Sequence, residues 1–211
     1  LVNRFNFLYG AIGVHPHNAS GYNADAEKTI REYQQHPKCR LLGEIGLDFH
    51  YDLSPRDIQK QVFDRQLGLA HDLGMKVQLH IREAHGDCMD MLRERAAQGR
   101  MPRGIMHCYT GSWEAAKVYL DFGLYISFSG ALTFKNAPKL QEVMENMPAD
   151  RILVETDCPY MAPVPLRGKR NEPAFITHTL AKAAEIRGIG PERMAEILYA
   201  NSLRIFDIEE D

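Results

Sequence analysis

The sequence predicts an α/β fold built on parallel strands, and three observations lead to this prediction. Short apolar runs alternate with amphipathic segments of helical length along the whole chain. Several of these runs end at an acidic or imidazole side chain, as Ile152-Leu153-Val154 does before Asp157. The chain has 211 residues and is 45% hydrophobic, which is enough for one sizeable core. We therefore expect a single domain over residues 1–211 in which strands and helices alternate.

Six strands are expected from the apolar runs. Ile, Leu and Val in succession suit a strand buried on both faces, and Pro159 cannot donate to a ladder, so the last strand must end before it. The expected strands are residues 8–14, 41–46, 77–80, 105–107, 125–128 and 152–154. Because helices separate them, right-handed crossovers and a parallel sheet are required.

Helices are expected between the strands, at residues 25–36, 55–73, 84–98, 113–122, 138–147, 172–187 and 191–206. The second one is the most clearly marked. Ser54 is expected as its N-cap, Pro55 as its first helical residue, and Gly74 as its end. Its apolar stripe consists of Ile58, Val62, Leu69 and Leu73.

Charge and composition exclude several classes of protein. A net charge of −3 argues against a generally basic nucleic-acid-binding protein, so any contact with nucleic acid must be a local basic patch. The four cysteines are scattered without a Cys-x-x-Cys pair, which favours reduced thiols. No apolar run approaches the roughly 20 residues that span a bilayer, and no signal peptide is recognisable. We therefore predict a soluble cytoplasmic protein without membrane contact, and infer no stable protein partner.

Metal-ligand side chains occur at the ends of four expected strands. These residues are Glu44, His80, His107 and Asp157. A single histidine at such a position is more often a hydrogen-bonded core residue. Parallel strands, however, bring their carboxyl ends to one face, where two histidines and two carboxylates together indicate a metal site. The mixed ligands suit one or two divalent ions, namely zinc, manganese, iron or a more weakly held magnesium.

Six stretches carry a resemblance to a known family. They are residues 13–17 (GVHPH), 43–48 (GEIGLD), 80–84 (HIREA), 107–111 (HCYTG), 125–130 (YISFSG) and 155–160 (ETDCPY). The chain resembles the TatD-type metal-dependent deoxyribonucleases of the amidohydrolase-like TIM barrels. This resemblance implies a TIM-type (β/α) barrel and hydrolysis of DNA phosphodiesters by a metal-activated water. It also implies that Glu44 bridges two metals, that His80 and His107 complete one, and that Asp157 binds the other and assists deprotonation of the water.

One part of the family pattern is missing. The family opens with a strand carrying a His-x-His pair, followed by a helix and a second strand, and no such pair precedes His15. We therefore expect a barrel without its first two βα units, with apolar edges that favour association and with weak binding of at most one metal ion. His15-Pro16-His17 has the His-x-His spacing, but it aligns with the third strand of the family and is not expected to bind metal.

Basic residues provide candidate phosphate contacts. Arg82 follows His80 by two residues, and Arg167, Lys169 and Arg170 lie in a loop that the family also uses. The alternative for this loop is a solvated surface turn. The sequence therefore predicts a metal-dependent deoxyribonuclease with DNA as its substrate. Two alternatives remain, a hydrolase of another ester bond, such as a D-aminoacyl-tRNA deacylase, and a catalytically silent truncated form.

Overall fold

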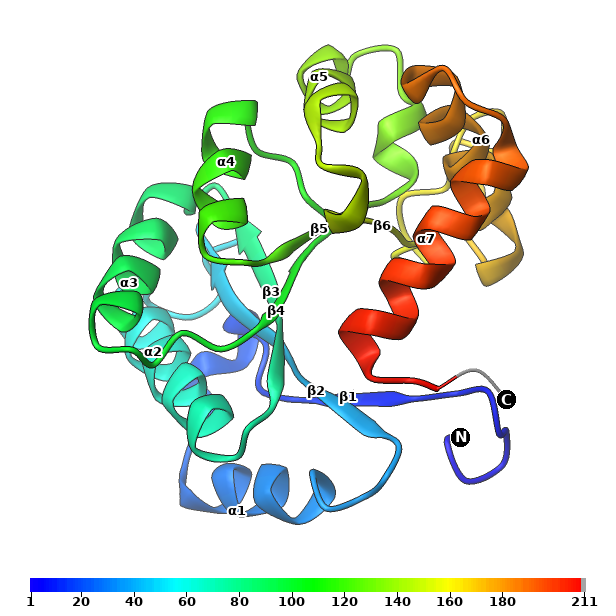
Figure 1. Ribbon diagram of the computed structural model, residues 1–211. Helices are drawn as coiled ribbons and strands as arrows, with labels where there is room; N and C mark the ends of the chain where they lie inside the picture. Colours follow the sequence, from blue (N-terminus) through cyan, green and yellow to red (C-terminus); the bar gives the residue numbers. More distant parts are fainter. Residues whose placement is uncertain (210–211) are drawn as a thin grey trace. The chain divides into compact units, whose positions relative to one another are not determined.

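The computed structural model describes residues 1–209, and within them strands and helices alternate as the sequence predicts (Figure 1). The chain divides into two compact units, Leu1–Met106 and His107–Asp211. All six expected strands are found, and the register is parallel for β1 with β2, β2 with β3, and β5 with β6. No helix among the described residues is both long and apolar enough to cross a bilayer.

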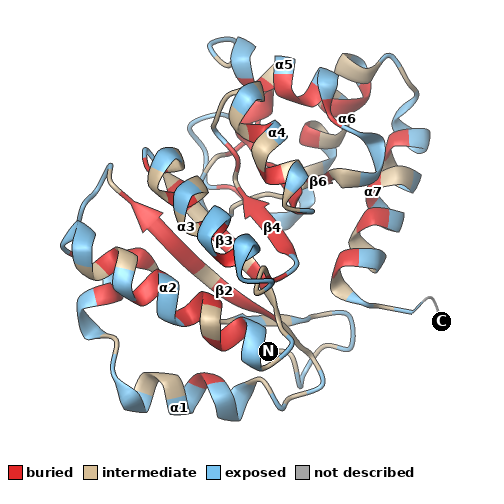
Figure 2. Cartoon of the chain, turned by 60° about the vertical axis from the view of Figure 1, so that its left-hand side comes forward, coloured by how far each residue is buried: buried red, intermediate tan, exposed pale blue. Residues whose placement is uncertain are grey.

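The first unit holds a parallel sheet covered by helices. Its elements are β1 (Gly10–Ile12), the 3-10 helix η1 (Pro16–Gly21), α1 (Ala24–Tyr33), β2 (Cys39–Asp48), α2 (Arg56–Asp72), β3 (Lys76–Arg82), α3 (His85–Ala97) and β4 (Gly104–His107), whose last residue begins the second unit. These four strands are neighbours in chain order. Helices α2 and α3 lie along one side of β2 and β3 (Figures 1 and 2).

The core of this unit lies between β2, β3 and α2. Leu42, Ile45 and Leu47 of β2 and Phe63 and Leu67 of α2 are fully buried. Helix α2 packs on β2 and β3 (Figure 2). Helix α1 contributes one buried residue, Ile30, and is otherwise a solvated helix. The near-continuous burial of β2 is what a strand covered on both faces requires.

The second unit repeats the alternation with more helices. Its elements are α4 (Trp113–Asp121), β5 (Tyr125–Phe128), η2 (Gly130–Thr133), α5 (Pro138–Asn146), η3 (Ala149–Arg151), β6 (Ile152–Val154), η4 (Pro173–Phe175), α6 (Ile176–Arg187) and α7 (Pro191–Phe206). Strand β5 pairs with β6 from Ile126 opposite Ile152 to Phe128 opposite Val154. The buried Asn201 of α7 donates to the carbonyl oxygens of Ala149 and Ile152, both at 2.8 Å, and so fixes α7 beside the start of β6.

The bounds of three strands differ from the prediction by two residues or more. The expected strand 8–14 is reduced to Gly10–Ile12, because the side chain of Gln66 takes over the backbone bonding of Val14. Its amide oxygen accepts from Val14 N at 2.8 Å, and its amide nitrogen donates to Val14 O at 2.9 Å. Strand β2, in contrast, runs from Cys39 to Asp48 and is two residues longer at each end, and β3 continues two residues past His80 to Arg82.

Ser54 is not the N-cap that the sequence predicted. Pro55 occupies the cap position, α2 begins at Arg56, and no side chain caps the helix. The buried Ser54 hydroxyl instead donates to His17 O at 3.0 Å and accepts from Ser20 N at 3.1 Å. A partner distant in sequence has therefore replaced the local one, and η1 is tied to the start of α2.

The start of α6 also differs, since this helix was predicted from residue 172. The chain first forms the 3-10 turn Pro173–Phe175, and the α-helix begins at Ile176. All four cysteines are free thiols, as their scattered positions predicted.

Candidate metal centre

Strand β2 carries two carboxylates in the first unit, Glu44 and Asp48. Between them, Gly46 pairs with His80 of β3, and its φ of 148° is one that side chains rarely adopt. A Cβ atom at Gly46 would overlap the carbonyl oxygen of His80, so only glycine allows the two strands to approach here. The glycine therefore brings His80 beside the two carboxylates.

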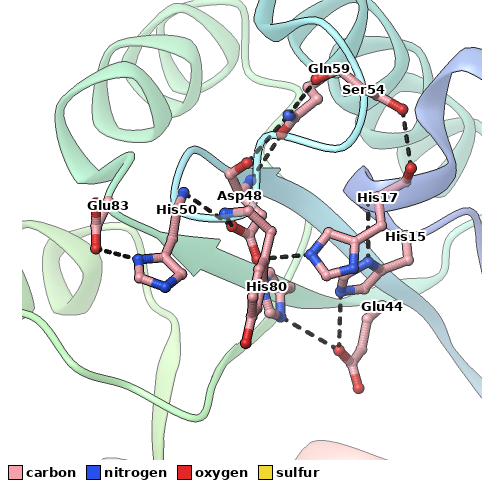
Figure 3. A network of polar contacts seen from close by, with 10 residues as sticks. His15, His17, Glu44, Asp48, His50, Ser54, Gln59, His80 and Glu83 are labelled. Carbon is pink, nitrogen blue, oxygen red and sulfur yellow. Dashed lines mark hydrogen bonds and ion pairs between the residues drawn. The ribbon is translucent and has the colours of Figure 1, made fainter.

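Asp48 is completely buried and accepts four hydrogen bonds. Its Oδ2 lies 2.8 Å from Nε2 of His17 and 3.1 Å from Nε2 of His80 (Figure 3). Its Oδ1 accepts from the backbone nitrogens of His50 at 3.0 Å and Tyr51 at 2.9 Å. Burial alone would raise the pKa of Asp48, but the bonds from Tyr51, His17 and His80 outweigh it and lower the pKa to about 2.

The second nitrogen of the His80 ring, Nδ1, faces Glu44. Nδ1 of His80 lies 3.5 Å from Oε2 of Glu44 (Figure 3). Two ligand atoms at about 2.1 Å from one tetrahedral ion are separated by about 3.4 Å. The pair therefore has the spacing of two ligands on one metal ion.

His15 and His17 lie against the same pair, although the sequence did not predict them at a metal site. One ligand atom each from His15, His17 and His80 lies within 4.8 Å of the others, and Nε2 of His15 is 3.8 Å from Oε2 of Glu44. Burial, together with repulsion from His80 and His17, lowers the pKa of His15 to about 4, against the opposing effect of Glu44 and Asp48. The His15 imidazole is therefore neutral at pH 7.

The second unit contains a related arrangement around His107, the last residue of β4. Nδ1 of His107 lies 2.9 Å from Oε1 and 3.0 Å from Oε2 of Glu155, and the bond geometry favours Oε2 as the acceptor. Nε2 of the same ring lies 3.6 Å from Oδ1 of Asp157. His107 and Asp157 therefore form a second imidazole and carboxylate pair at ligand spacing.

The chain around Asp157 is held by a buried amide. Asp157 has a φ of 55°, a left-handed conformation that aspartate tolerates better than most residues. Nδ2 of Asn171 donates to the carbonyl oxygens of Thr156 at 2.7 Å and Tyr160 at 2.6 Å. The segment after β6 thus has a fixed path although it contains no regular structure.

Each predicted ligand thus has a histidine or carboxylate neighbour within its own unit, Glu44 with His80 and His107 with Asp157. Sequence reasoning gave no role to Asp48 and Glu155, the carboxylates that hold the two histidines. A signal for both was present. Asp48 follows Glu44 by four residues and Glu155 precedes Asp157 by two, so each accompanies a predicted ligand at even spacing.

The predicted phosphate contacts have aromatic neighbours. The Arg82 guanidinium lies 4.7 Å from the ring centre of Tyr51, and the rings of Tyr51 and His17 are perpendicular with their centres 5.4 Å apart. In the second unit, the Arg167 guanidinium lies 4.2 Å from the ring centre of Phe134, while Lys169 and Arg170 are exposed. Arg82 is thus connected to the histidine cluster through Tyr51, and the basic loop is a solvent-facing segment.

Comparison with known proteins gives consistent matches over the whole chain. The family described as "TatD related DNase" matches residues 1–207. The uncharacterized metal-dependent hydrolase YabD of Bacillus subtilis is 41% identical over 208 residues, covering 99% of this chain and 81% of YabD. The 3'-5' ssDNA/RNA exonuclease TatD of a Rahnella strain is 37% identical over 206 residues, covering 95% of this chain and 78% of that protein.

A solved structure agrees with these matches. The crystal structure of YJJV, a TatD homologue from Escherichia coli K12, superposes with a TM-score of 0.90 at 26% identity. The match covers 99% of this chain and 80% of that one. The fold class expected from the resemblance is therefore confirmed.

Proposed function

Because this chain belongs to the TatD-related family of metal-dependent hydrolases, as its motifs predicted, we propose that it hydrolyses phosphodiester bonds of DNA, working from strand ends. A nuclease of this family, the Rahnella TatD, is named as an exonuclease of single-stranded DNA and RNA. DNA is the substrate that the motifs predicted, and RNA is the alternative that this relative suggests.

One observation supports the metal-dependent part of the proposal most strongly. In each unit an imidazole nitrogen faces a carboxylate oxygen at 3.5 or 3.6 Å, while the other nitrogen of the same ring is held by a second carboxylate. Histidine ligands of metals characteristically donate their second nitrogen in this way. We therefore assign metal binding to Glu44, His80, His107 and Asp157.

A bound divalent cation would supply activation of water and neutralisation of phosphate charge, which slow phosphodiester hydrolysis requires. The protein residues have separate tasks. Glu44 and His80 would hold a cation in the first unit, and His107 and Asp157 would hold one in the second. Asp157, whose side chain is 28% exposed, would also accept a proton from the attacking water.

Phosphate positioning is assigned to the basic residues. The guanidinium groups of Arg82 and Arg167 offer paired donors that match phosphate oxygens. Lys169 and Arg170 add exposed charge to the loop that contains Arg167. These groups position any phosphodiester without reading its sequence, which suits a nuclease that removes terminal nucleotides.

Oligonucleotides labelled at either end test this function. The protein is incubated with single-stranded DNA in the presence of magnesium, manganese or zinc, with a chelator as the control. Shortening from one end, abolished by the chelator, is the expected result. The same substrate panel includes RNA and a D-aminoacyl-tRNA ester, and cleavage of only that ester would replace the proposal by the deacylase alternative.

Metal content separates the enzyme from a silent form. About two ions per chain would support the enzyme, with both imidazole and carboxylate pairs occupied as in a two-metal hydrolase, and none or one would support the silent form. Inability to bind any of the three metals, together with no cleavage of any substrate, would establish the silent form.

A further inference from the structure

The hydrogen bonds of Asp48 lead to an inference that rests on the proposed metal site. We infer that Asp48 is a positioning residue that sets the tautomers of His17 and His80, so that His80 presents Nδ1 to the metal. The buried carboxylate reaches both rings from the centre of the network in Figure 3. It comes from the same strand as Glu44 but need not contact the ion.

The first step is the orientation of the carboxylate itself. Its Oδ1 accepts from two backbone N–H groups, those of His50 and Tyr51, which can act only as donors. The strand backbone on either side of it is fixed by Gln59, whose side chain accepts from Asp48 N at 2.8 Å and donates to Asp48 O at 3.1 Å. Rotation of the carboxylate out of this plane would leave two part-buried backbone donors without acceptors, which is costly.

The second step concerns the two rings. An ionised carboxylate can only accept, so the nitrogens that face Oδ2 must carry hydrogen. These are Nε2 of His17 at 2.8 Å and Nε2 of His80 at 3.1 Å. In the neutral rings the lone pair then belongs to Nδ1. At His80 this is the nitrogen that lies 3.5 Å from Glu44 Oε2, where a cation between the two would be favourable.

The same reasoning distinguishes two candidate metal sites that share His80. One is the pair of Glu44 and His80, and the other is the cluster of His15, His17 and His80. Nδ1 of His15 accepts from the backbone nitrogen of His17 at 3.2 Å. A neutral His15 therefore carries its proton on Nε2, the atom that is 3.8 Å from Glu44. His15 acts as a donor toward the site, so the triple-histidine cluster lacks a lone pair that it would need for a metal.

Asp48→Asn is the informative variant because it changes the donors and acceptors without changing the size of the side chain. The single amide oxygen is needed by the backbone N–H groups of His50 and Tyr51, so the amide N–H₂ faces the two rings. Both rings must then accept at Nε2, and the proton of His80 moves to Nδ1. Loss of a hydrogen-bond partner that orients a ligand histidine without contacting the metal typically costs about 10- to 100-fold in metal affinity.

Ser54→Ala is the matched control. Ser54 is buried and bonds His17 O and Ser20 N, so its removal loosens the same loop without touching a ring nitrogen. The measurements are long-range ¹H–¹⁵N correlation spectra of the histidine rings in the metal-free protein, and calorimetric titration with zinc and with manganese. Ring signals are assigned with His17→Asn and His80→Asn.

In the native chain, both His17 and His80 should show the tautomer protonated on Nε2. Asp48→Asn should convert His80 to the tautomer protonated on Nδ1 and weaken metal binding about 10- to 100-fold, while Ser54→Ala preserves both properties. A native His80 protonated on Nδ1 overturns the inference, even if Asp48→Asn fails to fold. Unchanged metal affinity in a folded Asp48→Asn protein also overturns it. Neither measurement uses DNA, so failure of the nuclease proposal is recorded separately.

Discussion

The two candidate ligand histidines, one in each unit, are held in opposite senses. His80 in the first unit is held at Nε2 by Asp48 and faces Glu44 with Nδ1 at 3.5 Å. His107 in the second unit is held at Nδ1 by Glu155 and faces Asp157 with Nε2 at 3.6 Å. One principle, a carboxylate that orients a histidine toward a ligand carboxylate, is thus realised with either nitrogen.

The two holding carboxylates also differ in their surroundings. Asp48 is fully buried, lies within a strand and serves two rings and two backbone N–H groups. The side chain of Glu155 is 18% exposed and follows the end of β6. The first arrangement is therefore more rigid, and its disruption should cost more than that of the second.

Removal of a ligand carboxylate is expected to have the largest effect. Glu44→Ala and Asp157→Ala should each abolish hydrolysis, since loss of a direct ligand must exceed the about 10- to 100-fold cost of losing an outer partner. Circular dichroism should remain native, because both side chains are partly exposed, at 32% and 28%. Asp121→Ala, which removes an exposed carboxylate of α4, is the control. If either variant hydrolysed substrate at nearly the rate of the control, the substituted carboxylate would not be a metal ligand that hydrolysis requires.

The next largest effect tests the opposite tautomers directly. His107 should be protonated on Nδ1 in the metal-free protein, whereas His80 is protonated on Nε2. Glu155→Gln should weaken metal binding, by an amount at or below that of Asp48→Asn, because its amide can rotate in a partly exposed position. The ring spectra and calorimetry described above measure both. The same tautomer at both histidines would refute the comparison.

Asp48 should also make the free energy of unfolding depend on pH in the acid range. The pKa of Asp48 is lowered from 3.8 to about 2, since the hydrogen bonds from Tyr51, His17 and His80 outweigh the raising effect of burial. A depressed folded pKa means that this stabilisation is fully present above about pH 4 and disappears as the pH falls through about 2. At about 1.4 kcal/mol per pKa unit, it amounts to roughly 2 kcal/mol.

Urea unfolding of the metal-free protein between about pH 5 and about pH 2 measures this contribution. The free energy of unfolding of the native chain should fall toward that of Asp48→Asn as Asp48 becomes protonated. A difference between the two proteins that stays constant down to about pH 2 would contradict the predicted linkage.

The basic loop should give the smallest effect, because its residues are solvent-facing. Neutralising Arg167, Lys169 or Arg170 should weaken binding to all DNA sequences alike and reduce the salt slope by about one unit for each phosphate that the loop no longer neutralises. Metal content should not change. Lys28→Ala, on the exposed face of α1, is the control. An unchanged slope after all three are neutralised would assign the loop to solvated surface.

Much of this molecule follows from local sequence. The six strands and the order of the helices were predictable because hydrophobic periodicity is a property of neighbouring residues. The family was recognisable from short motifs such as residues 43–48 and 155–160. His107 ends β4 and Asp157 follows β6, as the apolar runs predicted, whereas Glu44 and His80 lie within β2 and β3 because these strands continue to Asp48 and Arg82.

Only the tertiary structure decided which nitrogen of each histidine is held, and by which carboxylate. Asp48 lies 31 residues from His17 and 32 from His80, and Glu155 lies 48 from His107. Spacing along a strand places a side chain on one face of the sheet, but ring rotation and tautomer depend on the partner across the fold. For the same reason Ser54 could be read from sequence as a helix cap, although its hydroxyl bonds His17 and Ser20 from a neighbouring element.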